Sequence, residues 1–186
     1  GLSPAPRLAA TTVVPPSFAS LVTQADYIVH GVVTAVTAER QVRDGHAVII
    51  TKVVVDVRET VAGTPPARLT LELLGGRVGD EALVVEGAPQ FAVGDEDILF
   101  VRGNGIQFSP LVAVMYGRYP VVHLAATGED FVARSNGQAL YRAADVALPL
   151  DQPAAHAAGA RPLTRAQFIT EIRNVFRGAR VQQKLQ

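Results

Sequence analysis

The side chains most capable of chemistry in this sequence are its four histidines, His30, His46, His123 and His156. None of them forms an HxH, HxxxH or HExxH spacing, which would place two imidazoles on one face of a strand or helix around a metal ion. His30 and His123 fall in predicted strands, where we expect their ring nitrogens to bond to the backbone, and we expect His46 and His156 to be solvated. Histidines distant in sequence could still converge in a folded sheet. A hydrolase or metal-dependent enzyme that uses His30, His123 and an acid is therefore the alternative to a non-catalytic protein.

Acidic residues cluster at Asp80-Glu81 and at Asp95-Glu96-Asp97. Paired carboxylates can perform general acid–base chemistry or bind a hard cation. Their spacing lacks the alternating oxygen ligands of a calcium loop, and Gly94 with the second cluster directly precedes an apolar strand. We interpret that cluster as a turn with solvated charges. No serine lies in a GxSxG elbow.

The glycine-rich segment GGRVG at 75–79 contains one arginine, Arg77. It lacks the lysine and the following Ser/Thr of a phosphate-binding loop, and no helical pattern follows it, as a dinucleotide-binding fingerprint requires. We interpret Arg77 as a turn residue whose charge is solvated or is presented to an anionic group of a partner.

The clearest helix is predicted from Thr164 to Arg177, where Thr164 and Gln167 form a capping box. We expect it to end at Gly178. Its apolar stripe, which we expect to pack on the chain's own sheet, comprises Phe168, Ile169, Ile172, Val175 and Phe176.

Arg173, Arg177, Arg180 and Lys184 follow at offsets of four, three and four, which would form one basic ridge if the helix continued past Gly178. From residue 161 to 186 there are six basic residues and one acid. Such a helix can dock on an anionic membrane or an acidic partner. Alternatively, the cations complement the dipole at the C-terminus of a helix that only packs on the sheet.

The elements that must position these groups are mostly short strands with turn dipeptides between them, which is typical of antiparallel β structure and not of βαβ units. A short helix is predicted at 17–26, with Ser17 as its N-cap. The predicted strands cover residues 27–37, 46–58, 68–74, 97–102, 106–114, 119–125, 130–134 and 138–142, with a glycine-rich excursion at 75–95. We divide the chain into an extended leader (1–16), a β-barrel domain (17–147), a linker (148–163) and a C-terminal helix (164–186).

Composition narrows the function further. The 186 residues include 17 basic and 17 acidic ones, so no excess of cations is available for a general nucleic-acid binder. The absence of cysteine excludes disulfides, cysteine-ligated zinc and a thiol nucleophile. No apolar run is long enough to span a bilayer. The proline-rich start without methionine suggests an exported protein, periplasmic or secreted, whose signal peptide has been removed.

Residues 18–102 read F-x-x-L-x-x-x-A-D-Y-I-V-H-G-x-V, then a long strand, a further strand and VGDEDILFVRG. This order resembles the netrin-like domains, including the tissue inhibitors of metalloproteinases, and is also similar to exported bacterial proteins of unknown function that share the opening motif. The resemblance implies an OB-type barrel in which Ala25-Asp26 opens the first strand and residues 164–177 form the closing helix. The cysteine with which metalloproteinase inhibitors chelate zinc has no counterpart in this chain.

These observations predict a mainly β, antiparallel, OB-like (netrin-like) barrel with one helix before the first strand and one at the end. We expect a non-enzymatic, extracytoplasmic module that binds a protein or peptide partner, with a protease among the candidates, and with neither nucleic acid nor a transmembrane segment involved. No residue is predicted to be catalytic, cofactor-binding or metal-binding. The partner-binding candidates are Arg77, Arg173, Arg177 and Arg180.

Overall fold

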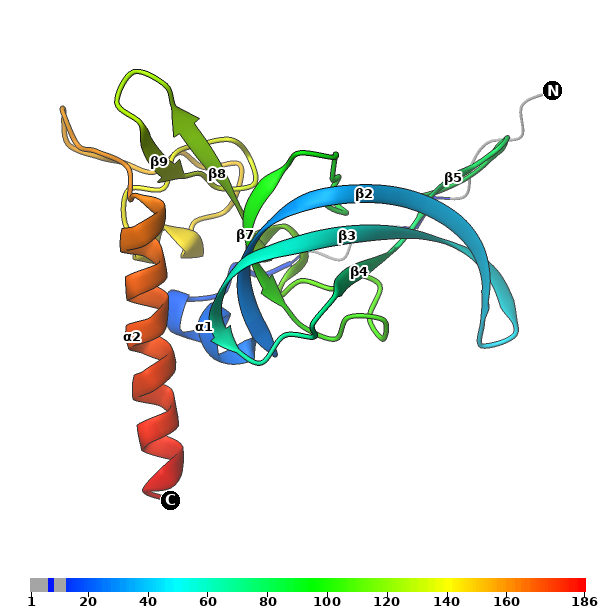
Figure 1. The fold of residues 1–186 in the computed structure, drawn as a ribbon, viewed down its shortest axis with the longest axis horizontal. Coiled ribbons are helices and arrows are strands. Elements are labelled where there is room, and N and C mark those ends of the chain that lie inside the picture. The colour runs from blue at the N-terminus through cyan, green and yellow to red at the C-terminus, as the bar shows by residue number, and fades with distance from the viewer. Residues whose placement is uncertain (1–6, 9–12) are drawn as a thin grey trace.

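The computed structural model describes residues 7–8 and 13–186 and shows a mainly β protein with two α-helices (Figure 1). Most of the predicted leader therefore lies outside the described residues. The elements are β1 (Arg7–Leu8), α1 (Phe18–Gln24), β2 (Tyr27–Arg43), β3 (His46–Gly63), β4 (Leu69–Leu74), β5 (Gly76–Val78), β6 (Glu81–Val85), β7 (Glu96–Val101), β8 (Arg118–Leu124), β9 (Glu129–Val132) and α2 (Arg165–Lys184), with short 3-10 turns at Val114–Gly117 and Ala143–Ala147.

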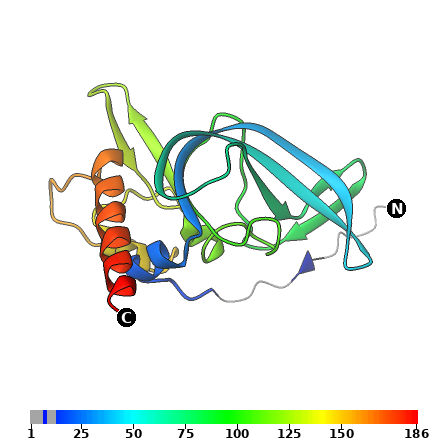
Figure 2. The ribbon, with the colours of Figure 1, turned by 60° about the horizontal axis from the view of Figure 1, so that its bottom comes forward.

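The main sheet has the strand order β4-β3-β2-β7-β8-β9 and is antiparallel throughout. Its centre is the long β2–β3 hairpin, which arches across the molecule (Figures 1 and 2). Asp44 and Gly45 turn this hairpin with φ of 51° and 77°, the left-handed pair that suits the twist of two-residue hairpins. A small second sheet, in the order β1-β6-β5, lies at the far end from α2.

In the described part of the chain the main sheet does not close into a barrel, because β4 and β9 stand at its two ends. The outer edge of β4 is instead covered by a loop. Asn104 accepts a bond from the Glu72 amide and donates one to the Thr70 carbonyl, and the Leu74 amide donates to Phe108 at 2.9 Å. The strands predicted at 106–114 and 138–142 are wrong, since each makes only a single bridge, at Leu111 and Ala139. Turns and a side-chain amide take the place of a regular ladder there.

Two hydrophobic cores lie on opposite faces of the central strands. One packs α1 and α2 against β2, β7 and β8, through Leu21, Ile28, Phe100, Tyr119 and Phe168 among others. The other fills the inside of the curved sheet and includes Val29, Val53, Leu71, Leu99 and Leu111. β7 and the first part of β2 (27–33) are therefore buried on both faces, which explains their nearly continuous apolar sequences.

The predicted N-caps of both helices are confirmed, and the predicted end of α2 is wrong. Ser17 accepts the Ser20 amide at the start of α1, and Thr164 with Gln167 forms the capping box of α2. However, α2 continues past Gly178 to Lys184. Gly178 does not adopt the left-handed conformation that ends a helix. An interior glycine costs only about 1 kcal/mol relative to alanine, so it does not stop a helix by itself.

The segment predicted as a linker is fixed to the body by Arg134. This guanidinium is fully buried and donates to the carbonyls of Leu148, Pro149 and Gln152. Carbonyl acceptors satisfy the buried cation and hold the chain where it turns toward α2. No helix in the described ranges has the length and apolar character needed to cross a membrane.

Replacement of Leu71 by alanine tests the inner core. Leu71 is fully buried, so Leu71→Ala should lower the free energy of unfolding by about 2–5 kcal/mol through lost burial and a residual cavity. Urea denaturation measures this loss. The exposed Val54 lies on the adjacent strand, and Val54→Ala should cost below about 1 kcal/mol. Equal costs would show that the register of β3 and β4 is wrong.

Replacement of Phe168 tests whether α2 is part of the folding unit. Its ring packs against those of Phe18, Phe100 and Tyr119, with centroids 5.9, 6.2 and 5.2 Å away. Phe168→Ala should therefore cost roughly 3–5 kcal/mol. A loss below about 1 kcal/mol in urea denaturation would show that α2 only rests on the sheet.

Candidate functional site

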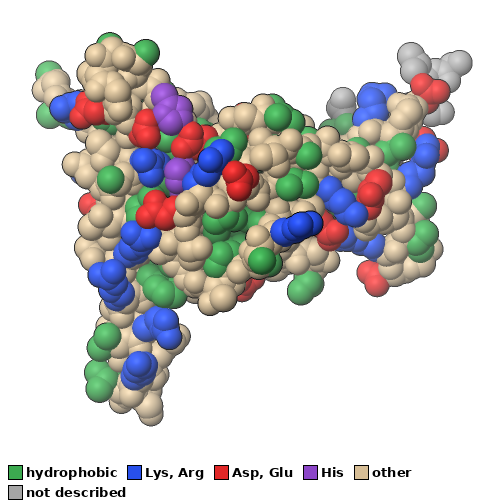
Figure 3. All heavy atoms as spheres, in the orientation of Figure 1, with side chains coloured by type: hydrophobic (Ala, Val, Ile, Leu, Met, Phe, Trp, Pro, Cys, Tyr) green, Lys and Arg blue, Asp and Glu red, His purple; other side chains and the backbone are tan. Residues whose placement is uncertain are grey.

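His30 and His123 converge on one carboxylate, that of Glu96. Glu96 opens β7 and points to the α2 side of the sheet, between His30 on β2 and His123 on β8. Nε2 of His30 lies 2.6 Å from one oxygen of Glu96, and Nε2 of His123 lies 2.5 Å from the other. Nε2 of His30 and both ring nitrogens of His123 thus contact carboxylates and not the backbone, contrary to the sequence-based expectation, and Nδ1 of His30 is buried without a hydrogen-bond partner. Figure 3 shows histidine side chains among acidic and basic ones on this face.

The ring of His123 is held between two carboxylates. Its Nδ1 contacts Asp130 at 2.5 Å while its Nε2 contacts Glu96. A carboxylate accepts hydrogen bonds, so these two contacts favour a ring with a proton on each nitrogen, the imidazolium cation. Hydrogen bonds to Glu96 and then to Asp130 raise the pKa of His123 above its ordinary value, although the side chain is 59% exposed.

The pKa values of the two carboxylates, Glu96 and Asp130, are lowered. Partial burial alone would raise the pKa of Glu96, but the hydrogen bonds from His30 and His123 together lower it. The hydrogen bond from His123 is the largest cause of the lowered pKa of Asp130. All three shifts favour the charged forms at neutral pH.

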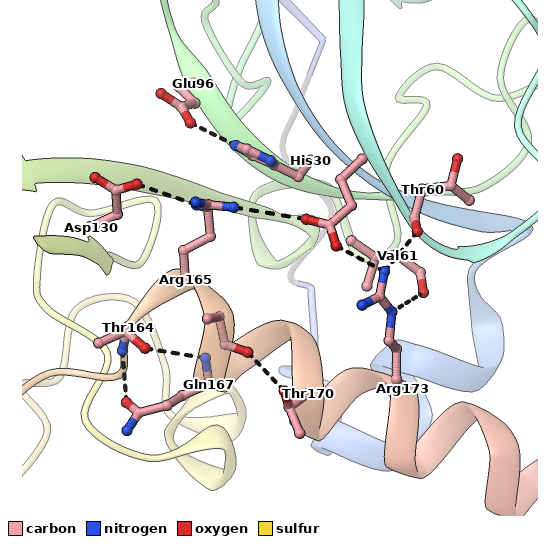
Figure 4. Close-up of polar contacts among 12 residues, drawn as sticks. His30, Thr60, Val61, Glu96, Asp130, Thr164, Arg165, Gln167, Thr170 and Arg173 are labelled. Atoms are coloured by element: carbon pink, nitrogen blue, oxygen red, sulfur yellow. Dashed lines mark hydrogen bonds and ion pairs between the residues drawn. The ribbon is translucent and has the colours of Figure 1, made fainter.

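The pairing continues onto α2 and β3. Arg165 contacts Asp130 at 3.3 Å and Glu59 at 3.7 Å, and Arg173 contacts the other oxygen of Glu59 at 2.9 Å (Figure 4). Arg173 also donates to the carbonyls of Thr60 and Val61. We call this series the ion chain: His30, Glu96, His123, Asp130, Arg165, Glu59 and Arg173. Basic and acidic groups alternate along it, and it ties five strands and α2 together.

The other two acids of the second cluster meet Arg118 on the opposite face of β7. Arg118 contacts Asp95 at 2.8 Å and the buried Asp97 at 3.0 Å. Burial raises the pKa of Asp97, and the charge of Arg118 opposes this rise. The interpretation of Asp95-Glu96-Asp97 as a solvated turn is therefore wrong. The strand begins at Glu96, so Glu96 and Asp97 enter the sheet and face its two sides.

The geometry of the cluster limits its chemistry. No group of three or more His, Asp or Glu side chains in the described part of the chain is arranged to hold a metal ion. Both oxygens of Glu96 and both nitrogens of His123 are already engaged. A hollow of about 230 Å³ lies beside Glu96, Arg118 and His123. Glu96 and His123 therefore form a structural clamp with no free base. Asp97 also lines the hollow, and one oxygen of its buried carboxylate has no hydrogen-bond partner.

A second hollow lies on the opposite face of the β8–β9 hairpin. It has a volume of about 400 Å³ and a mainly apolar lining. Val122 and Leu124 alternate with His123 along β8, so they point away from the ion chain and are 43% and 44% exposed. Phe131 on β9 pairs with Val122, and the chain at 160–162 forms a wall. Arg161 at the rim contacts Glu129 and lies 5.8 Å from the Phe131 ring. We call this hollow the apolar pocket.

The structure separates the arginines singled out from the sequence. Arg77 is exposed on β5, at the opposite end of the molecule from α2. Arg173 is engaged in the ion chain, whereas Arg177 and Arg180 lie on the outer part of α2, where they are exposed. His46 is exposed, and the exposed His156 stacks on Tyr141 with ring centroids 3.9 Å apart.

Sequence reasoning did not single out Glu59, Asp130 or Arg165 as site residues. None of them belongs to a motif, and no spacing connects them to a histidine. The alternation of His123 with Val122 and Leu124 indicates a strand but does not reveal which element faces it. Only the packing of α2 across the strands brings these side chains together.

The ion chain predicts a specific dependence of stability on pH. The folded pKa of His123 is raised above 6.5, so its contribution is fully present below pH 6.5 and is lost as pH rises through the folded pKa. Glu96 and Asp130 have lowered pKa values, so their contributions are present above 4.5 and 3.8 and are lost as pH falls through their folded pKa values. The ion chain is therefore strongest between about pH 4.5 and 6.5.

Thermal melting between pH 6 and 9 should show this effect. The melting temperature of the wild type should fall more than that of His123→Gln, which cannot titrate. The matched control is His46→Gln, at an exposed histidine outside the ion chain, and it should keep the wild-type slope. Identical slopes for all three proteins would contradict a charged His123 in the folded state.

No protein-family model matches the chain, and no curated protein or solved structure matches it either. The function proposed below therefore rests on the residues of this chain and their arrangement.

Proposed function

We propose that this protein is a non-enzymatic, extracytoplasmic module that binds an extended peptide segment of a protein partner. The observation that carries the proposal is the apolar pocket on the β8–β9 hairpin. Two large aliphatic side chains on one face of a strand, each more than two-fifths exposed, line a concave surface there. Exposed apolar surface of this kind is typical of an interaction site.

The lining of the pocket favours a peptide anchor over a polar small molecule. Small-molecule sites need several polar groups that converge to orient the ligand. Here Arg161 and Glu129 at the rim contact each other, and the floor is formed by Val122, Leu124 and Phe131. A volume of about 400 Å³ accommodates a leucine or aromatic side chain with its flanking backbone. Such anchors in apolar pockets carry most of the energy of many protein interfaces.

The ion chain supports the proposal because it fixes the position of the hairpin. His123 and Asp130 lie on the face of the hairpin opposite the pocket, and they connect β8 and β9 to β7 and α2. A rigid receptor surface loses less conformational entropy when a ligand binds. In this proposal the histidines have a positioning role.

The OB-like barrel and the exported location belong to the same proposal. The loop that covers β4 at Phe108 also bonds to β7 through Pro110 and Val112, which supports a barrel-like connection between these two strands. The extracytoplasmic location is proposed from the resemblance to exported proteins. A secreted or periplasmic protease remains one candidate partner, and the neutral net charge favours a protein over a nucleic acid.

The convergence of His30 and His123 on Glu96 favours a second candidate function, a hydrolase or metal-dependent enzyme. For an enzyme of this kind, a contact between Glu96 and one of the two histidines must break to free a base or a metal ligand. The two candidates use different faces of the hairpin, so variants can separate them. An enzyme would lose activity in Glu96→Gln and keep it in Leu124→Asp.

Selection from a displayed random-peptide library tests peptide binding. Selected peptides should share a leucine or aromatic residue, and Leu124→Asp should weaken their binding about 10- to 100-fold, because a buried apolar contact is replaced by a charge. Fluorescence polarisation measures the dissociation constant. The control Leu185→Asp changes an exposed leucine outside the pocket and should bind as the wild type does. Peptides that bind Leu124→Asp as tightly as the wild type would place the site elsewhere.

A further inference from the structure

The outer end of α2 extends beyond the body of the protein (Figures 1 and 3). Phe168, Ile169 and Ile172 are buried, and Val175 and Phe176 pack partly against the same core. From Arg177 onward every residue except Ala179 is exposed. The sheet therefore holds the first half of α2 and leaves the segment 177–186, here called the helix tip, in solvent.

The helix tip is amphipathic, but its apolar side does not pack against the sheet. Arg177, Arg180 and Lys184 follow at offsets of three and four, so they share one side of the helix. Val181 and Leu185 lie beside them at an offset of four and are 59% and 82% exposed. Gln182 and Gln183 occupy the opposite side. Figure 3 shows basic and apolar side chains together along this projecting end.

Charge decides which surface suits the helix tip. The sequence contains no acidic residue after Glu171, so every charged side chain of the helix tip is positive. Pairing with the same segment of a second copy would bring like charges together. An anionic surface complements the cations, and the two aliphatic side chains can enter the apolar layer just beneath it.

We propose that the helix tip docks along the surface of a bilayer that contains anionic lipids. Arg177, Arg180 and Lys184 contact lipid phosphates, and Val181 and Leu185 insert at the boundary of the acyl chains. The glutamine side faces water. The helix tip then tethers the module to the membrane while the apolar pocket, on a different part of the surface, stays available.

Co-sedimentation of the whole chain with vesicles tests this proposal. Vesicles of phosphatidylcholine with about one-third phosphatidylglycerol should bind the protein at least tenfold more strongly than phosphatidylcholine alone, since each basic residue near an anionic surface contributes roughly a fivefold gain. High salt should reduce binding, because it screens surface charges. Equal binding to both kinds of vesicle, or to neither, would overturn the proposal.

Matched variants locate the contact. Arg180→Glu and Leu185→Asp should each weaken binding to the anionic vesicles at least fivefold. The controls are Arg68→Glu, which makes the same charge reversal at an exposed turn residue, and Val42→Asp, which places a carboxylate at an exposed aliphatic position on β2. Both should bind as the wild type does. Circular dichroism verifies that all four variants are folded. If the controls lose as much binding as the α2 variants, the contact is not the helix tip, and the proposal is wrong.

Discussion

Burial of β7 and of the first part of β2 (27–33) on both faces is the constraint on which the rest of the structure depends. Ile28 and Phe100 face the two helices, while Val29 and Leu99 face the inside of the curved sheet. Polar side chains on a strand covered on both sides need partners within the protein, because burial removes most of their contact with water. His30, Glu96 and Asp97 stand on these strands, and each meets a partner of complementary charge or hydrogen-bonding character. Only Nδ1 of His30 and one oxygen of Asp97 are buried without a hydrogen-bond partner among these three residues.

The ion chain follows from that constraint. Partly buried charges are stable only when well-placed partners offset the cost of desolvation. In the ion chain basic and acidic residues alternate, so most of them contact an opposite charge on each side. The series lies where α2 begins to cross the sheet, and it continues the contact between helix and strands beyond the apolar core. Apolar packing through Phe168 and an ion pair through Arg165 therefore both hold the N-terminal part of α2 against the sheet.

The structure places different properties on different surfaces. The clamped face of the β8–β9 hairpin is polar and internally satisfied, whereas the opposite face of the same two strands is apolar and open. The helix tip carries positive charge at a third location. Strand alternation explains the first separation, because neighbouring residues on β8 point to opposite sides. The course of α2 explains the second, because its C-terminal end extends past the edge of the sheet.

The sequence by itself determined the local elements. Alternation in LTLEL, the Asp44-Gly45 turn, and the caps at Ser17 and Thr164 depend on neighbours within a few residues, so the corresponding strands and helix starts were predictable. The end of α2 was not, because Gly178 lowers helix stability without forbidding it. The solvated reading of Glu96 and Asp97 also failed, because their partners His30, His123 and Arg118 lie more than 20 residues away. The ion chain, the open order of the sheet and the apolar pocket exist only once strands distant in sequence lie side by side, and only the tertiary structure decided them.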